Sequence, residues 1–270
     1  MRKALFATCL LIAVLPAEAQ DAAAPDPCAA DARASFDVVS IRPSQTPSES
    51  STMNGTPDGV SITGSLRRMI LFGYSLHEFQ LTGGPDWVST STWAVHAKSD
   101  TPAPDFSKLS RAELQALLDK RMQQIQAMLM DRFQLKCHLA VKEMPVYELV
   151  QAKGGAKIKA TTAEASKQNS DSSSSHGLQM HNTAIGVTAA RIASLLTNEV
   201  DRMVVDKTGL TGSYDLTLDW AHDAPADSAD TPSGPAIFTA LKEQLGLRLV
   251  PAKGPVPVLV IDSVEKPSEN

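Results

Sequence analysis

The sequence has no excess of basic residues and no cluster of lysine or arginine. Lys and Arg together number 25 against 30 Asp and Glu, which gives a formal net charge of −5 at pH 7. A mildly acidic chain of this kind lacks the electrostatic footprint of a nucleic-acid-binding protein. It also lacks the polybasic segment that attracts anionic lipid headgroups. We therefore expect no nucleic-acid partner.

Beyond its first residues, the sequence also lacks an apolar run that could cross a bilayer, which needs roughly 20 residues. Two basic residues precede the apolar run 4–15, and the small-residue pattern Ala17-Glu18-Ala19 follows it. That order is typical of a secretory signal peptide, residues 1–19, cleaved before Gln20. We expect an exported chain, periplasmic or secreted, with no membrane span in its mature form.

The spacings of common catalytic and metal motifs are missing as well. Gly-x-Ser-x-Gly is absent, and Ser-x-x-Lys occurs only near the C-terminus, after a predicted strand and not at a helix start. Cys137 and His138 are neighbours on a predicted strand, so their side chains point to opposite faces. No His-x-x-x-His or Cys-x-x-Cys spacing is present. We predict no catalytic residue, cofactor or metal; His176, Met180 and His181 are the best candidates for a soft-metal trio.

Cysteine is scarce, with three in the whole chain and only Cys28 and Cys137 beyond the signal peptide. In an oxidising compartment an even pair can form a disulfide. Such a bridge would join a flexible N-terminal arm, residues 20–35, to a predicted strand. Two unpaired thiols are the alternative.

What the sequence does contain is a weak internal repeat. In each half, a short strand is followed by a helix with apolar residues at i, i+3 and i+4, and then by a hairpin with glycines at its turn. A second helix ends each unit, at Phe133-Gln134-Leu135 and at Leu245-Gly246-Leu247. We expect each of these helices to lead into a second hairpin, with strands 137–141 and 146–150 in the first half, and 247–250 and 256–262 in the second.

These patterns predict an α+β fold of two similar lobes, each strand–helix–hairpin–helix–hairpin, with mainly antiparallel sheets and helices packed on one face. The first lobe is predicted to span 36–152 and the second 177–264. A Ser-rich linker, 153–176, is too polar to bury much apolar area and is expected to join them. Residues 265–270 are predicted to form a C-terminal tail.

Several stretches match a known group of proteins: Phe36–Ser44, Gly83–Trp87, Asp131–Leu135, Asp206–Asp215 and Gln244–Leu247. Over nearly the whole mature length, the chain resembles a family of exported proteins of unknown function that is expanded in soil bacteria, notably acidobacteria. The resemblance implies export. It implies no particular activity, because none is established for the family. The order of elements in the second half also has a looser likeness to the short N-terminal domain of secretins and TonB-dependent receptors, which binds protein partners in the periplasm.

Candidate binding residues fall into two groups. Trp87, Trp93 and Trp220 would form a binding face if exposed, because aromatic residues are favoured at interface hot spots; as core anchors they would need no further role. The second group lies around the turn of the second half's first hairpin and comprises Asp206, Lys207, Thr208, Tyr214 and Asp215. For this group an Asx-type structural turn is the alternative to a site.

Two functions remain open from the sequence. The leading hypothesis is an exported, non-enzymatic binding module whose partner is a protein of the cell envelope or the medium. An exposed apolar patch or an unpaired sheet edge would favour it. The alternative is a hydrolase-like enzyme with a site between the lobes, which would be favoured by a cleft holding paired polar groups with shifted pKa values.

Overall fold

The computed structural model describes residue 28 and residues 35–267, apart from 48–49, 57, 101–103, 106–107, 163, 165–169, 177 and 223–233. The predicted signal peptide and its cleavage site lie outside the described residues. The described part of the chain is α+β, as predicted, with three four-stranded sheets in which antiparallel pairing dominates. No helix in these ranges is long and apolar enough to span a bilayer.

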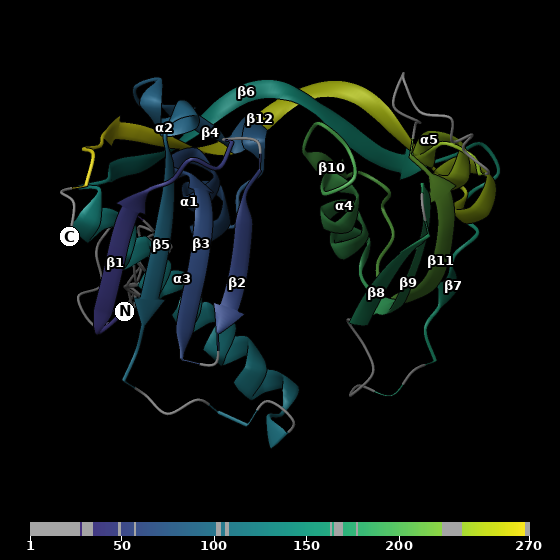
Figure 1. Cartoon of the computed structure of the whole chain (residues 1–270). Coiled ribbons are helices and arrows are strands. Elements are labelled where there is room, and N and C mark those ends of the chain that lie inside the picture. The colour runs from purple at the N-terminus through teal and green to yellow at the C-terminus, as the bar shows by residue number, and fades with distance from the viewer. Residues whose placement is uncertain are drawn as a thin grey trace, which may run out of the picture.

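The first sheet is entirely antiparallel and forms one face of the first lobe (Figure 1). Its strands, in order across the sheet, are β1 (Val38–Pro43), β5 (Thr92–Lys98), β3 (Gly59–Ser65) and β2 (Thr52–Thr56). Two helices pack on one face, α1 (Leu66–Gly73) and the longer α3 (Arg111–Arg132). The hydroxyl oxygens of Ser65 and Ser110 cap these helices by accepting from backbone N–H groups of the first turn.

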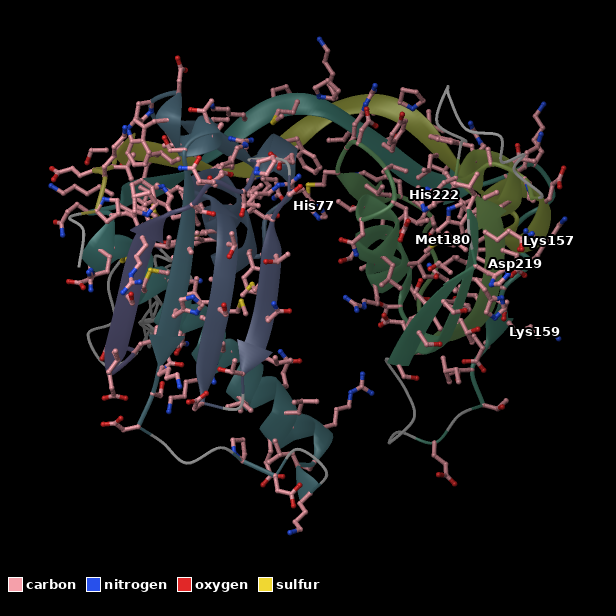
Figure 2. The ribbon with its side chains drawn as sticks, in the orientation of Figure 1. His77, Lys157, Lys159, Met180, Asp219 and His222 are labelled. Atoms are coloured by element: carbon pink, nitrogen blue, oxygen red, sulfur yellow. A yellow bond between two sulfur atoms is a disulfide. The ribbon has the colours of Figure 1, made fainter. Side chains whose placement is uncertain are left out.

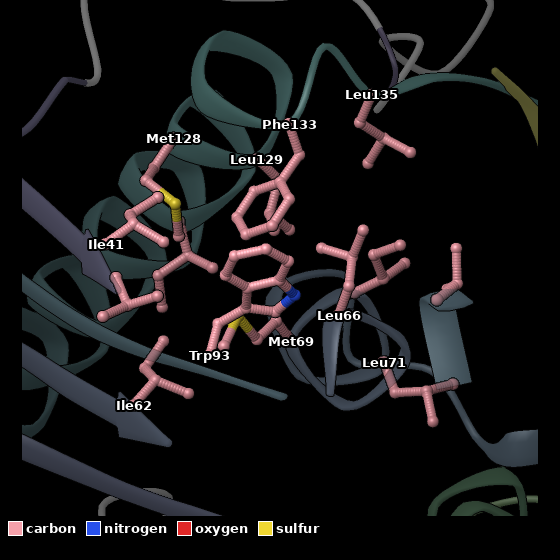
Figure 3. Packing of buried hydrophobic residues seen from close by; sticks show 14 of the residues in the cluster. Ile41, Ile62, Leu66, Met69, Leu71, Trp93, Met128, Leu129, Phe133 and Leu135 are labelled. Carbon is pink, nitrogen blue, oxygen red and sulfur yellow. The ribbon is translucent and has the colours of Figure 1, made fainter. Parts of the chain in front are cut away.

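The core of the first lobe lies between this sheet and the two helices (Figure 3). Leu66 and Met69 of α1 and Leu129 of α3 are fully or almost fully buried there. The ring of Trp93, on β5, meets the ring of Phe133 edge to face, with centroids 5.9 Å apart. The short elements η1 (Glu78–Gln80), β4 (Leu81–Gly83) and α2 (Trp87–Thr90) follow α1 and precede β5 in the chain, and they complete the lobe.

A second antiparallel sheet belongs to the other lobe. Its strands, in order, are β7 (Lys159–Ala160), β11 (Tyr214–Ala221), β9 (Gln179–Val187) and β8 (Ser170–His176). The helices α4 (Ala189–Thr197), α5 (Ile237–Ala240) and the π-helical turn η4 (Leu241–Leu245) pack against it.

The prediction of a linker over 153–176 is wrong where β7 and β8 lie. The serine run needs little apolar burial because it forms an edge strand that is mostly exposed.

The third sheet is a long ribbon that joins the lobes (Figure 1). Its two central strands, β6 (Lys136–Gln151) and β12 (Leu247–Ser263), pair antiparallel over their whole length. β4 adds in parallel to β12, and β10 (Val204–Asp206) adds in parallel to β6. The predicted second hairpin of each half is therefore wrong, because each of these segments is one continuous strand.

Pro145 directly precedes the predicted strand 146–150, and its place in the ribbon shows why the chain does not turn there. It lies on β6 opposite Lys253, two residues before the start of the pairing with β10 at Tyr147. A proline lacks the N–H for a ladder hydrogen bond and is tolerated in a strand whose edge is open. The proline therefore continues the strand and does not reverse the chain.

The two lobes share strands through this ribbon. Leu259 and Ile261 of β12 pack in the first core, although they come from the second half of the chain. Leu149 of β6 packs in the second core, although it comes from the first half. The outer sheets have corresponding orders, β1-β5-β3-β2 and β7-β11-β9-β8. That the predicted ranges 36–152 and 177–264 superpose stays a prediction.

Candidate functional site

The three tryptophans do not form a common exposed face. Trp93 and Trp220 are buried, each in a different core. Trp87 is half-buried against the first core, and the ammonium group of Lys266 lies 5.7 Å from its ring centroid. Trp93 and Trp220 thus act as core anchors and offer little surface to a partner.

The second group of candidate binding residues, around the turn after β10, makes the hydrogen bonds of a structural turn. The carboxylate of Asp206 accepts hydrogen bonds from the backbone N–H and the hydroxyl of Thr208, at 2.9 and 2.7 Å. Asp215 accepts from the backbone N–H of Gly186, and the hydroxyl of Tyr214 donates to the carbonyl of Thr211. Lys207 is exposed. These contacts are those of an Asx-type turn and its neighbouring strand.

A disulfide joins Cys28 to Cys137, which are 109 residues apart in the sequence. Cys137 lies at the start of β6, and both sulfur-bearing side chains pack against the first core. The bridge therefore ties the N-terminal arm to the first lobe.

The histidines of the predicted soft-metal trio line a hollow of about 370 Å³ on the second lobe, together with Met180, Asp219 and Trp220. Figure 2 labels Met180 and Asp219. His181 Nδ1 lies 2.5 Å from Asp219 Oδ1, and His181 Nε2 lies 3.3 Å from the Thr183 hydroxyl. This acid–imidazole–hydroxyl order is that of a nucleophile and its base. More than half of both the imidazole and the carboxylate is exposed, however, so water screens them. Within the described ranges, no group of three metal-ligating side chains is arranged to hold an ion.

A hollow of about 710 Å³ lies on the first lobe. We call it the α1–α3 groove. It is lined by the start of β2, by α1 with the turn that follows it, and by the N-terminal half of α3. Its apolar wall consists of Met53, Ile62, Leu71, Phe72, Leu76, Leu118 and Met122.

A difference in helix length creates this groove. α1 has 8 residues and α3 has 22, and they meet where Gly73, at the end of α1, faces Ile125 of α3. A methyl group at Gly73 would come within 2.9 Å of the Ile125 side chain, so glycine permits this close approach. The buried residues of α3 begin only at Gln124. The preceding turns of α3 therefore extend past α1, and their apolar side chains have no helix to pack against.

Two large apolar side chains on the groove are substantially exposed. Phe72, on α1, is 42% exposed, and Leu118, on α3, is 48% exposed. Burying a large apolar side chain contributes about 1.5–3 kcal/mol. An apolar group that covered both would therefore gain a substantial part of this free energy.

The end of the groove near α1 carries an ion cluster. The Glu78 carboxylate lies 2.8 Å from Arg67 Nε and 3.3 Å from a guanidinium nitrogen of Arg68. Two guanidinium groups share one carboxylate, so this cluster has a net positive charge. His77 lies beside it and stacks on Phe79, with ring centroids 5.3 Å apart (Figure 2 labels His77). Burial lowers the pKa of His77, so the imidazole is neutral at neutral pH.

The α3 side of the groove carries the opposite charge. Asp119 lies there, and its carboxylate accepts a hydrogen bond of 2.8 Å from the side-chain amide of Gln115. The second lobe has a smaller hollow, about 180 Å³, in a comparable place between β8, β9, α4 and η4. The α1–α3 groove is thus the larger of the two and has exposed apolar residues at its opening.

The comparison with known families covers the part of this region that begins at α1. Residues 67–264 match the model of a family described as a protein of unknown function (DUF3738). The chain belongs to this family. The DUF3738 match begins within α1 and ends just after β12, so it covers the second lobe, the ribbon and the helices of the first lobe, but not β1, β2 and β3. No curated protein and no solved structure matches the chain.

Sequence reasoning missed the groove residues Phe72 and Leu118. The signal for the second was present, since Leu114, Leu117, Leu118 and Met122 continue the apolar spacing of α3 towards its N-terminus. An apolar stripe predicts a buried helix face. Which part of that stripe stays uncovered depends on the length of the neighbouring helix, and that is a tertiary property.

Proposed function

We propose that this DUF3738 protein is an exported, non-enzymatic binding module, and that its α1–α3 groove binds an apolar part of a protein partner. The observation that carries the proposal is the exposure of Phe72 and Leu118 on a hollow of about 710 Å³. Binding sites for compact ligands have volumes of roughly 300–1,000 Å³ and predominantly apolar walls. Exposed apolar residues gathered on one concave surface are typical of interaction sites.

The proposed location of the partner is the cell envelope or the medium. The signal-peptide pattern of residues 1–19 supports export through cleavage before Gln20. A disulfide between Cys28 and Cys137 fits an oxidising compartment. The likeness of the second half to the short N-terminal domain of secretins and TonB-dependent receptors supports a protein partner over a small molecule, by analogy of element order alone.

Capture of partners by matched variants tests the proposal. The mature protein is immobilised as wild type, Phe72→Glu and Leu118→Glu, and each is incubated with envelope extract and culture medium of the source cells. The controls are Leu139→Glu and Val141→Glu on β6, because these side chains are 51% and 69% exposed and lie outside the groove. A carboxylate on the groove should exclude an apolar ligand group, because burying an unpaired charge is costly.

We expect the same protein to be retained by the wild type and by both β6 variants, and to be lost from both groove variants. Circular dichroism and melting of each variant show that the fold is intact. A partner that is retained equally by all five proteins would contradict the proposed binding surface.

A further inference from the structure

Resting on the proposed function, we infer that the α1–α3 groove binds a segment of the partner in extended conformation, which adds to β2 as a fifth, antiparallel strand of the first sheet. In this mode the main chain of the ligand bonds to an exposed sheet edge, and alternate side chains enter pockets beside it. This mode requires a free sheet edge and a groove beside it. Both are present at β2.

The free edge belongs to β2. Among the described residues, β2 is the last strand of the first sheet and pairs only with β3. β1 (Val38–Pro43) forms the opposite edge of the sheet and contributes no residue to the groove. Figure 1 shows β2 on the side of the first lobe that faces the second lobe. Edge strands are commonly protected by proline, lysine or a bulge. The sequence of β2, Thr-Met-Asn-Gly-Thr, has neither residue, and its register with β3 is regular.

The groove lies on the face of the sheet to which the apolar residues of β2 point. Met53 is opposite Ile62, which is buried, and both line the groove. Directly opposite residues in an antiparallel pair share a face. Alternate side chains of an added strand would therefore point into the groove, towards Phe72 and Leu118, and the others would point to solvent. This arrangement selects a segment in which apolar and polar residues alternate.

Gly55 leaves room for that segment. It lies within β2 on the same face as Met53, and a Cβ built on it would have no heavy atom within 4 Å. Neither crowding nor a positive φ requires a glycine there. Glycine within a strand weakens the strand and often marks a place where another backbone or a ligand comes close.

Charge along the groove gives the segment its direction. The Arg67–Arg68–Glu78 cluster is near the start of β2, because a Cβ at Gly64 would lie within 4 Å of both Ser51 and Arg68. Asp119 belongs to the part of α3 that extends beyond α1, and in Figure 1 the first turns of α3 reach past the end of the sheet at which β2 finishes. An antiparallel strand would bring its C-terminal end to the arginines and its N-terminal end towards Asp119. The favoured segment thus has a basic residue before, and an acidic residue after, its alternating stretch.

Synthetic peptides test this inference with the full mature protein. The first is a nine-residue peptide, acetylated and amidated, of sequence Lys-Thr-Leu-Thr-Val-Thr-Leu-Thr-Glu. The second exchanges the terminal Lys and Glu. Two further peptides carry N-methyl groups on alternate backbone amides, one on each alternate set. Affinity is measured by titration calorimetry for the wild type, for Leu118→Glu and for the control Leu139→Glu.

We expect the first peptide to bind the wild type and Leu139→Glu and to lose binding to Leu118→Glu. Exchanging the charges should weaken binding about two- to fivefold, as for exposed ion pairs. N-methylation of the set that faces β2 should weaken it about tenfold or more, because hydrogen bonds are lost and the methyl groups clash, whereas the other set should have little effect.

The two proposals fail in different ways. If the peptide bound in a Leu118-dependent manner but tolerated both methylation patterns, strand addition would be wrong and apolar binding in the groove would stand. If no peptide bound while envelope capture still depended on Leu118, the extended segment would likewise be wrong. If neither peptide binding nor capture depended on Leu118, the proposed function itself would fail.

Discussion

At the scale of single residues, the ends of two helices separate two effects on stability, the cost of a left-handed backbone and the cost of crowding. Gln134 follows α3 with φ of 49°, and Gly246 follows η4 with φ of 64°. Both are left-handed, a conformation that glycine adopts readily and other residues adopt at a cost of about 1–2 kcal/mol. Gln134 offsets part of this cost, since its side-chain amide donates to the carbonyl of Asp131 at 2.5 Å.

Replacing Gly246 by alanine should be strongly destabilising. The new Cβ would lie 2.3 Å from the carbonyl oxygen of Gly155 and 2.9 Å from the backbone nitrogen of Lys157, in addition to the strain of positive φ. We expect Gly246→Ala to lower the free energy of unfolding by about 2–4 kcal/mol. The matched change Gln134→Gly should alter it by less than about 1 kcal/mol. Urea unfolding followed by circular dichroism measures both, and an equal loss in the two variants would show that the close approach at Gly246 is wrong.

At the scale of elements, the central part of the ribbon holds the two lobes to one another. Val256 and Val258 of β12 are fully buried there with Val146 of β6. Phe79, from η1 of the first lobe, and Met203, beside β10 of the second lobe, pack against them. This small cluster therefore contacts both lobes, and it fixes how they sit on the ribbon.

Truncation of Val258 tests the contribution of this cluster. Val258→Ala removes two buried methyl groups and should lower the free energy of unfolding by about 1–3 kcal/mol. Val141→Ala, on the exposed face of the same ribbon, should change it by less than about 0.5 kcal/mol. Thermal or urea melting gives both values. Similar values for the two variants would show that Val258 is not buried in a packed cluster.

Elements also show where sequence patterns inform and where they fail. The helices α1, α3 and α4 follow from their apolar spacing. In the structure, the side chains of Ser65, Ser110 and Thr188 cap them. The sequence does not show that β6 and β12 are continuous strands. A proline such as Pro145 occurs both in turns and on open strand edges, and the local sequence does not distinguish the two. The strand β8 was missed because polar serines carry no period-2 apolar signal, and only pairing with β9 makes them a strand.

At the scale of the whole molecule, the two lobes are intertwined, since β6 and β12 each supply residues to both cores. The two lobes nevertheless differ in their surface hollows. The first lobe has the long α3 and a hollow of about 710 Å³, whereas the second has the short α5 and η4 and, in the comparable place, a hollow of about 180 Å³. The sequence predicts two similar lobes, but this difference between their surfaces could not be predicted, because it depends on which helix extends past its neighbour.

Hydrogen–deuterium exchange of the mature protein, alone and with the captured partner, tests the central claim most directly. Amides that become buried or hydrogen-bonded on binding exchange more slowly. We predict that the partner slows exchange in β2 (Thr52–Thr56) and in the first two turns of α3, and leaves β8 (Ser170–His176) of the second lobe unchanged. Protection confined to the second lobe or to the exposed face of β6, with β2 and α3 unaffected, would contradict the account.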